Sequence, residues 1–237
     1  IEGDVGIGTT SPSDRLHVAG NVTIENGSLF QPVYGSDDGL VLYLPFNSPN
    51  GSTQYDYSPY GNDGTQYNGT CNAINGKYGA GCSFDGNGDY IEVSDSDLWA
   101  FRNGSFTVEL WTKFNDTGDS IFIGNDQGGG SVNKWVFLKE SGLLRFHVNN
   151  GTAMYPIAIP WTPSSGQWYH LSVTRSNSTW NLYIDGRNVN TSTFSVDIPN
   201  PSAALTIGVA EGIYYLNGSI DEVRIYKRAL SADEIRT

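Results

Sequence analysis

Long apolar runs, cations and cysteines are all scarce in this sequence, and each shortage argues against a class of protein. No stretch approaches the roughly 20 apolar residues that a membrane-spanning helix needs. Lys and Arg total 13 against 25 Asp and Glu, which gives a formal net charge of -12. Nucleic-acid binding is therefore not expected, because neutralising phosphates requires clusters of cations that this chain lacks.

Sequence patterns of catalysis are missing as well. The three histidines, His17, His147 and His170, lie far apart, and neither a His-Glu-x-x-His pair nor a Gly-x-Ser-x-Gly elbow is present. Retaining glycosidases place two carboxylates about 5 to 5.5 Å apart. The closest approach to such a pair, in residues 92–97, lacks the spacing that would put two glutamates on one face of a strand. We therefore expect no enzymatic activity and assign no catalytic residue.

The two cysteines, Cys71 and Cys82, stand eleven positions apart with three glycines between them. They lack the paired C-x-x-C spacing of a zinc site. We predict a disulfide between them, which implies an oxidising compartment. The alternative is a pair of reduced, buried thiols.

Glycine and aromatic residues are abundant, a balance typical of strand-and-turn proteins. The chain has 29 Gly and 13% aromatic residues but only 16% charged residues. In Phe106–Phe114, apolar side chains alternate so that one face of a strand is predicted to be buried. Similar alternation occurs in residues 40–46, 90–93, 135–138, 143–148, 168–175, 180–184, 205–209 and 220–226. We predict an all-β protein in which Ser231 and Glu234, a capping box, open one short C-terminal helical turn.

Residues 1–35 differ in character from the rest of the chain. Leu16 and Val18 alternate with Val22 and Ile24 around a glycine, which predicts a small hairpin. An isolated hairpin is marginal in water, so this β-arm needs another surface to lie on. That surface is either the edge of its own domain, residues 36–237, or a neighbouring copy to which the arm adds a strand. In the second case the inserted side chains are those of Val5, Ile7, Leu16, Val18, Val22 and Ile24.

Acceptor tripeptides for N-linked glycans are in excess. Ten Asn-x-Ser/Thr sequences are present, against about 3.6 expected by chance from 21 Asn and 41 Ser plus Thr. Six precede glycine, and Asn-Gly favours hairpin turns, which would put sugars on hairpin tips. The alternative is that a turn-rich protein accumulates these residues anyway. The predicted glycosylation sites are Asn21, Asn26, Asn50, Asn68, Asn103, Asn115, Asn150, Asn177, Asn190 and Asn217.

Short motifs spread over residues 39–235 follow one another in the order of a known domain family. They include GLVLYLPF at 39–46, DYSPYGNDG at 56–64, SFTVELW at 105–111, QWYHL at 167–171, LYIDG at 182–186 and GSIDEVRIY at 218–226. Together they resemble the laminin G-like, concanavalin A-like jelly-roll domains. The resemblance implies a two-sheet antiparallel sandwich, whose relatives are mostly carbohydrate- or protein-binding modules of extracellular proteins. Fold alone does not fix function.

A second, shorter resemblance covers residues 3–20 (GDVGIGTTSPSDRLHVAG). This segment is similar to a motif in the stems of phage tail fibres and of bacterial or archaeal surface fibres. Such stems commonly repeat the motif, whereas it occurs here once. The chain begins at Ile1, as would a mature chain that has lost its leader or a trimmed piece of something longer.

Calcium is the one metal that we consider. Asp221 shares strand parity with Val223 and Ile225, so it is predicted to point toward a buried side. A buried carboxylate needs backbone donors or a cation, because an unpaired buried charge costs several kcal/mol. Some jelly-roll relatives hold a structural Ca²⁺ with an acid near this last strand, and oxygen-rich loops suit that ion. The resemblance thus implies a site of Asp221 with Asp56 and Asp63, or else a purely hydrogen-bonded Asp221.

Two functions remain as hypotheses. The first is a glycosylated, non-catalytic structural or adhesive subunit of the cell surface or extracellular space, which assembles into a fibre or filament through its β-arm. The second is a secreted or surface-displayed lectin-like module that does not polymerise. Aromatic side chains stack on sugar rings, and the candidates in loop-like or strand-edge positions are Tyr55, Tyr57, Tyr60, Tyr155, Trp161, Tyr214 and Tyr215.

Overall fold

The computed structural model describes residues 5–7, 16–18, 39–47, 51–72, 74–130 and 133–236. The chain divides into two compact units, Ile1–Gly35 and Ser36–Thr237. Within the described ranges, no helix is long and apolar enough to cross a membrane.

The first unit contains two short strands, β1 (Val5–Ile7) and β2 (Leu16–Val18), which pair in parallel. The sequence predicts instead that Leu16 and Val18 form a hairpin with Val22 and Ile24. Those last two residues lie outside the described part of the chain, and the described partner of β2 is β1. The parallel pairing differs from the predicted hairpin, because a two-residue turn can join only antiparallel strands.

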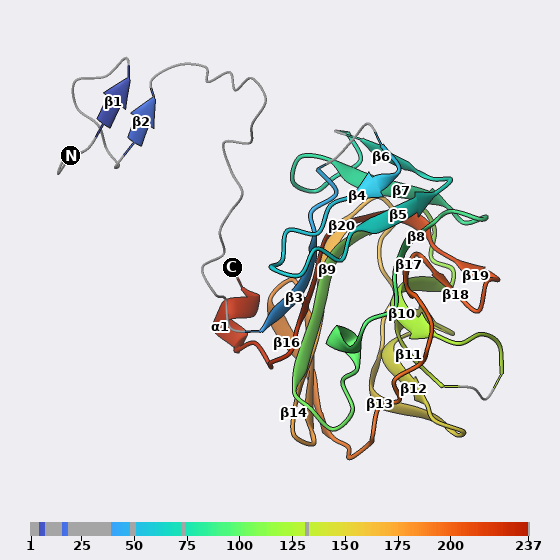
Figure 1. The fold of residues 1–237 in the computed structure, drawn as a ribbon. Helices are drawn as coiled ribbons and strands as arrows, with labels where there is room; N and C mark the ends of the chain where they lie inside the picture. The colour runs from blue at the N-terminus through green and yellow to red at the C-terminus, as the bar shows by residue number, and fades with distance from the viewer. Residues whose placement is uncertain are drawn as a thin grey trace. The chain divides into compact units, whose positions relative to one another are not determined.

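The second unit is a sandwich of two sheets, each with mainly antiparallel strands (Figure 1). The predicted all-β jelly-roll class is therefore confirmed. The first sheet has the strand order β16-β15-β14-β9-β20-β7-β6, with β3 paired to β20, and the second has the order β13-β12-β11-β10-β17-β8-β5-β4. Strands far apart in the sequence are neighbours in both sheets, so the register of each is set by side-chain packing rather than by local turns alone.

The bounds of the elements follow in two groups. The first sheet consists of β3 (Leu40–Leu44), β6 (Thr70–Asn72), β7 (Gly81–Asp85), β9 (Phe106–Phe114), β14 (Trp168–Ser176), β15 (Thr179–Ile184), β16 (Arg187–Thr193) and β20 (Asn217–Tyr226). The second consists of β4 (Thr53–Gln54), β5 (Gly64–Tyr67), β8 (Tyr90–Val93), β10 (Ser120–Asp126), β11 (Lys134–Glu140), β12 (Leu143–Asn149), β13 (Ala153–Pro160) and β17 (Leu205–Ile207). Outside them lie the 3-10 turn η1 (Asp97–Trp99), the hairpin of β18 (Val209–Ala210) with β19 (Tyr214–Tyr215), and helix α1 (Ala232–Ile235).

Aromatic side chains fill the space between the sheets. Phe106 of β9 lies 5.4 Å from Phe146 of β12 and 5.6 Å from Trp180 of β15, measured between ring centroids. Trp135 of β11 stacks on Phe146 with an interplanar angle of 9°. All four side chains are fully buried. Burying each one contributes on the order of 2 to 3 kcal/mol, so this cluster is a main source of cohesion between the two sheets.

Strand β9 differs from its prediction on one point. Its inward residues are buried as predicted, but Thr107 and Glu109 on the outward face are buried too. The reason is the C-terminal segment, which lies over this face. Thr107 Oγ1 donates to the carbonyl of Arg228 and accepts the N–H of Leu230, both at 2.9 Å. A strand covered on both faces is not distinguishable from a half-buried one by alternation alone.

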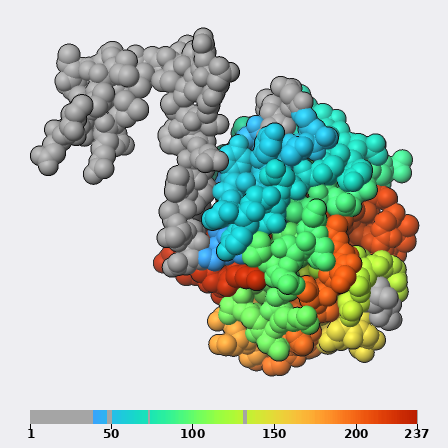
Figure 2. Space-filling model, in the orientation of Figure 1, coloured from blue at the N-terminus to red at the C-terminus, as the bar shows by residue number. Residues whose placement is uncertain are grey.

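The C-terminal helix begins with the predicted capping box. Ser231 Oγ accepts the N–H of Glu234, and the Glu234 carboxylate accepts the N–H of Ser231. Figure 2 shows the C-terminal residues in red beside a green segment. Lys227 Nζ, just before the helix, donates to the carbonyl of Asp97 in η1 at 2.9 Å. The box thus fixes the end of the segment that covers β9.

The predicted disulfide joins Cys71 of β6 to Cys82 of β7, and the two residues are directly opposite each other in the sheet. The loop that it closes turns back sharply. A Cβ on Gly81 would lie 2.5 Å from the Cα of Gly76, and one on Gly76 would lie 2.3 Å from the carbonyl oxygen of Ala80. Only glycine allows this close approach of the backbone.

Replacing both cysteines in a Cys71→Ser, Cys82→Ser variant is expected to lower the free energy of unfolding by about 2 to 3 kcal/mol, since closing a loop of this length removes that much entropy from the unfolded chain. Urea unfolding monitored by tryptophan fluorescence measures the change. The double variant should not respond to a reductant, whereas reduction should destabilise the wild type. Equal stability of oxidised and reduced wild type would contradict this account of the loop.

Candidate functional site

The outward face of the second sheet carries a hollow over strands β10 to β13. It encloses about 120 Å³. Its floor is apolar, and the β18–β19 hairpin, which contacts β10, contributes to it. The floor consists of Ile121, Val136, Leu138 and Ala210.

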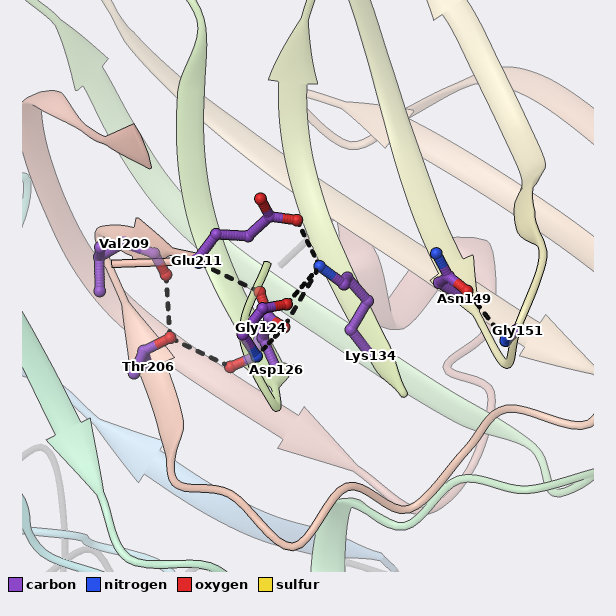
Figure 3. A network of polar contacts seen from close by, with 9 residues as sticks. Gly124, Asp126, Lys134, Asn149, Gly151, Thr206, Val209 and Glu211 are labelled. Carbon is purple, nitrogen blue, oxygen red and sulfur yellow. Dashed lines mark hydrogen bonds and ion pairs between the residues drawn. The ribbon is translucent and has the colours of Figure 1, made fainter. Parts of the chain in front are cut away.

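A buried lysine ties together three segments at one end of this hollow. Lys134 Nζ donates to the carbonyl of Gly128 at 2.8 Å, forms an ion pair with Glu211, and lies 3.4 Å from Asp126 Oδ1. Asp126 Oδ2 also accepts the N–H of Glu211 at 3.1 Å. Figure 3 shows the Lys134 ammonium between the two carboxylates. Because Lys134 is 1% exposed, both carboxylates are needed to offset the desolvation of its charge.

A second group of hydrogen bonds holds the hairpin over the sheet. Thr206 Oγ1 bonds to the carbonyl of Val209 at 2.9 Å and to that of Gly124 at 3.4 Å (Figure 3). At the end of β12, Asn149 Oδ1 accepts the N–H of Gly151 at 3.0 Å and so shapes the turn between β12 and β13. The hairpin and the turn next to the hollow are therefore held by polar contacts.

Exposed aromatic rings form the rim. Tyr155 of β13 is 44% exposed and Tyr214 of β19 is 49% exposed. Arg145 lies 4.1 Å from the centroid of the Tyr155 ring and forms an ion pair with Glu140. His147 lies 5.0 Å from the same ring, between centroids. Tyr155 is thus held in place while much of its surface faces solvent.

The histidine of the hollow is neutral over most of the pH range. Burial lowers the pKa of His147 to about 4, and the charges of Lys134 and Arg145 lower it further. Its Nε2 atom is buried and has no hydrogen-bond partner among the described residues. A neutral imidazole has one ring nitrogen that donates and one that accepts, so an unpaired ring nitrogen can form a hydrogen bond with a hydroxyl group.

The aromatic residues proposed from the sequence fall into different environments. Two of them, Tyr155 and Tyr214, line the same hollow. Trp161 is half-buried and packs against the core through the rings of Phe114 and Tyr169. The remaining candidates lie in other loops or pack locally, and they are Tyr55, Tyr57, Tyr60 and Tyr215. The sequence analysis missed Lys134, Asp126 and Glu211. One signal was present in β11, where Val136 and Leu138 are apolar on the face opposite Trp135 and Phe137. Such a strand is apolar on both faces, which indicates that its outward face is covered as well.

A β-bulge changes the predicted orientation of Asp221. Glu222 adopts a φ of 54°, and the pairing of β20 with β9 shifts between Asp221 and Arg224. Asp221 therefore lies opposite Trp111 on the outward face, not on the inward face of Val223. The predicted parity is wrong because an extra residue in a strand reverses the alternation.

Backbone donors surround the Asp221 carboxylate. Its Oδ2 atom accepts the N–H groups of Lys77 and Tyr78 at 2.7 and 2.9 Å, and its Oδ1 atom accepts that of Glu222 at 2.8 Å. Burial raises the pKa of Asp221 to about 7, against the opposite effect of these donors. The side chain thereby fastens the loop after Cys71 to the first sheet.

The other two predicted calcium ligands organise a separate loop. Asp56 accepts the N–H groups of Tyr43, Ser58 and Asn62, and Asp63 accepts that of Asp56. Across the described ranges, no three His, Cys, Asp or Glu side chains come together as a metal site. Asp221, Asp56 and Asp63 are thus not gathered around one point, and their arrangement does not fit a shared calcium ion.

A buried acid and a histidine meet on the outward face of the first sheet. Glu109 Oε2 lies 3.6 Å from His170 Nε2, and Glu109 Oε1 lies 3.8 Å from Arg224 Nη1. Burial raises the pKa of Glu109 to about 7, and Arg224 acts in the opposite direction. Burial lowers the pKa of His170 to about 4, and Arg224 lowers it further. Near pH 5.5 both partners are therefore mainly neutral.

The glycan acceptors also separate into groups. Asn21, Asn26 and Asn50 lie outside the described residues. Asn68 and Asn150 lie in turns, as predicted for Asn-Gly, but Asn190 and Asn217 lie within strands β16 and β20. For Asn217 the hairpin-tip prediction is wrong, since the following Gly218 is needed inside the sheet. A Cβ there would lie 2.3 Å from the carbonyl oxygen of Lys113.

Comparisons with known proteins agree on the fold. A family model described as the concanavalin A-like lectin/glucanases superfamily matches residues 85–236. Domain 4 of AbnA, a GH43 extracellular arabinanase from Geobacillus stearothermophilus whose structure contains arabinotriose, is 22% identical with a TM-score of 0.68. That alignment covers 84% of this chain and 97% of the domain.

Two toxin domains are similar as well. The receptor binding domain of botulinum neurotoxin C/D mosaic serotype is 16% identical with a TM-score of 0.66, and the alignment covers 84% of this chain and 50% of that one. The binding domain of Paraclostridial Mosquitocidal Protein 1 is 16% identical with a TM-score of 0.64, over 84% and 51%. The chain therefore spans about half the length of either toxin domain. The sequence matches no curated protein significantly.

The raised pKa of Glu109 predicts how the free energy of unfolding changes with pH. Between the unfolded value of 4.5 and the folded value of about 7, the native state keeps a proton that the unfolded state has released, so stability falls as pH rises. A Glu109→Gln variant lacks this titration. Relative to wild type, its free energy of unfolding should increase between pH 4.5 and pH 8 by at least about 1 kcal/mol. Urea unfolding at several pH values tests this, and a difference that stays constant with pH would refute it.

Proposed function

The chain belongs to the concanavalin A-like lectin/glucanases superfamily, and from that premise we propose that it is a non-catalytic carbohydrate-binding module whose ligand lies in the hollow of the second sheet. The observation that carries the proposal is that the exposed rings of Tyr155 and Tyr214 line one hollow, together with an apolar floor and the fixed polar groups at its end. Aromatic rings stack on sugar rings, while a few fixed polar groups set the orientation of the ligand.

The charges of the hollow favour a neutral sugar. Carboxylates outnumber ammonium groups in its lining, and His147 is neutral above about pH 4. A uronic acid or sulfated sugar would meet repulsion that a hydroxyl-rich neutral sugar avoids. The charged residues of the lining are Asp119, Asp126, Lys134, Glu140 and Glu211.

An extracellular setting fits this function. The Cys71–Cys82 disulfide implies an oxidising compartment, and the excess of glycan acceptors in the sequence agrees with secretion or surface display. The absence of paired catalytic acids in the sequence supports binding without hydrolysis. Because the similar arabinanase domain was determined with arabinotriose, short arabinose oligosaccharides and arabinan are the first ligands to test.

Truncating the rim should abolish binding. Tyr155→Ala and Tyr214→Ala are each expected to weaken binding of a neutral oligosaccharide about tenfold or more, since one stacked aromatic ring contributes roughly 1.5 kcal/mol. Isothermal titration calorimetry against arabinotriose and a panel of neutral glycans measures this. Tyr60→Ala is the matched control, because Tyr60 is 55% exposed but lies in a different loop. Equal losses from all three changes, or release of reducing sugars by the wild type, would count against the proposal.

A second function, assembly into a fibre, is supported by the first unit. Its β1–β2 pair contains only three residues in each strand, and such a small sheet is not stable without further strands or a covering surface. A neighbouring copy can provide that surface through strand addition. The connection then passes from one molecule to the next and propagates as a filament. The resemblance of residues 3–20 to fibre stems points the same way.

Deleting residues 1–30 should leave a folded, soluble monomer if the arm is the connector, because the described core residues of the second unit run from Leu40 to Ile235. Size-exclusion chromatography and negative-stain microscopy of the full chain and the truncated chain compare the two. Polymers of the truncated chain would show that another surface makes the connection. A full chain that remains monomeric at high concentration would remove the assembly function altogether.

A further inference from the structure

Two of the predicted glycan acceptors bind each other. Asn115 Nδ2 donates to Asn217 Oδ1 at 2.9 Å, and Asn217 Nδ2 donates to Asp116 Oδ2 at 2.6 Å. The backbone N–H of Asn115 also donates to the carbonyl of Asn217 at 3.1 Å. We call Asn115, Asp116 and Asn217 the amide interlock. It joins the end of β9 to the start of β20.

A glycan on either asparagine would crowd the amide interlock. The sugar replaces one of the two hydrogens on Nδ2, the atom that donates the bond in each case, and its bulk would lie directly beside the partner side chain. The acceptor tripeptide of Asn217 ends at Ser219. This serine is 4% exposed and lies inside the first sheet opposite Ser83 and Lys113. Each amide is thus engaged by a partner in the folded protein, and a sugar added before folding would hinder the interlock from closing.

Two other acceptors have the opposite character. Asn103 and Asn177 are exposed, and no side-chain hydrogen bond is made by either within the described residues. Asn177 forms the turn between β14 and β15 with a φ of 54°. Arg175 holds the backbone of both regions, because its Nε donates to the carbonyl of Asn177 at 2.7 Å and its Nη1 to that of Arg102 at 2.8 Å. The backbone next to Asn103 and Asn177 is therefore fixed, while their side-chain amides have no hydrogen-bond partner among the described residues.

We propose that Asn103 and Asn177 carry N-linked glycans, and that Asn115 and Asn217 remain unmodified in the folded protein. In the modification, Nδ2 forms a bond to the anomeric carbon of an oligosaccharide activated on a lipid phosphate carrier. The carrier leaves with the electron pair of the broken carbon–oxygen bond, and the amide loses one proton. The proposal concerns sites distinct from the hollow and does not depend on sugar binding there.

Asn103 and Asn177 lie at one end of the first sheet, and Asn115 and Asn217 lie at the other. Asn103 precedes β9 and Asn115 follows it, and a strand of nine residues spans about 30 Å. Arg175, beside Phe106 in the sheet, places Asn177 at the same end as Asn103. The glycans would therefore gather at one end, on turns of the first sheet, whereas the hollow is built from strands of the second sheet.

The test is a glycopeptide map of the full chain, secreted from a host that glycosylates Asn-x-Ser/Thr. Site occupancy is measured by mass spectrometry before and after enzymatic release of the glycans. The variants Asn103→Gln and Asn177→Gln should each remove one glycan mass and leave the melting temperature nearly unchanged. The variants Asn115→Gln and Asn217→Gln are the matched controls. They should leave the glycan mass unchanged but lower the melting temperature by about 2 to 4 °C, the shift that the loss of roughly one hydrogen bond gives in a domain of this size.

The possible outcomes separate clearly. Occupancy of Asn103 and Asn177 with unmodified Asn115 and Asn217 supports the proposal. A glycan on Asn115 or Asn217 in the folded, secreted protein would overturn it, because the amide interlock would then not have excluded the sugar. Absence of glycan from both Asn103 and Asn177 would overturn it as well. In neither failure is the sugar-binding hollow affected, since binding of arabinotriose is measured independently.

Discussion

The shared interior of the two sheets is the constraint on which the rest of the structure depends. Phe106 and Trp180 from one sheet pack against Phe146 from the other, with Trp135 beside them. Once the inward residues are fixed in this way, the alternation of each strand also fixes which residues face outward. A shift of β11 by one position would carry the Lys134 ammonium into an apolar interior, which no described partner there could compensate.

Charged groups on the outward faces are buried by two different means. On the second sheet, Lys134 is enclosed by Asp126 and Glu211, so a cationic side chain is matched by two carboxylates. On the first sheet, Glu109 is buried beside His170 and Arg224, and burial pushes its carboxyl group toward the neutral form. The first arrangement leaves a hollow with a rigid floor and exposed rings, whereas the second leaves a closed, pH-sensitive patch. This difference is why we place the ligand on the second sheet.

Much of the architecture could be predicted from the sequence because the relevant signals are local. Alternation identified the long central strands such as β9 and β14, and the Ser231 capping box identified the helical turn. The orientation of Asp221 could not be predicted, since it depends on a single bulge at Glu222 that leaves no clear pattern in the sequence. The hollow was also hidden, because Asp126, Lys134 and Glu211 come from three separate segments. Only the pairing of β10 with β11 and the fold of the hairpin bring them together.

The most direct measurement of the central claim is an NMR titration of the isotopically labelled chain with neutral oligosaccharides, starting with arabinotriose. If the ligand lies in the hollow, the backbone amide shifts that change should cluster in β11, β12 and β13 and in the β18–β19 hairpin, with Lys134, Tyr155 and Tyr214 among the most affected. Shifts that cluster instead around Glu109 and His170 on the first sheet, or no shift with any neutral glycan, would contradict the account.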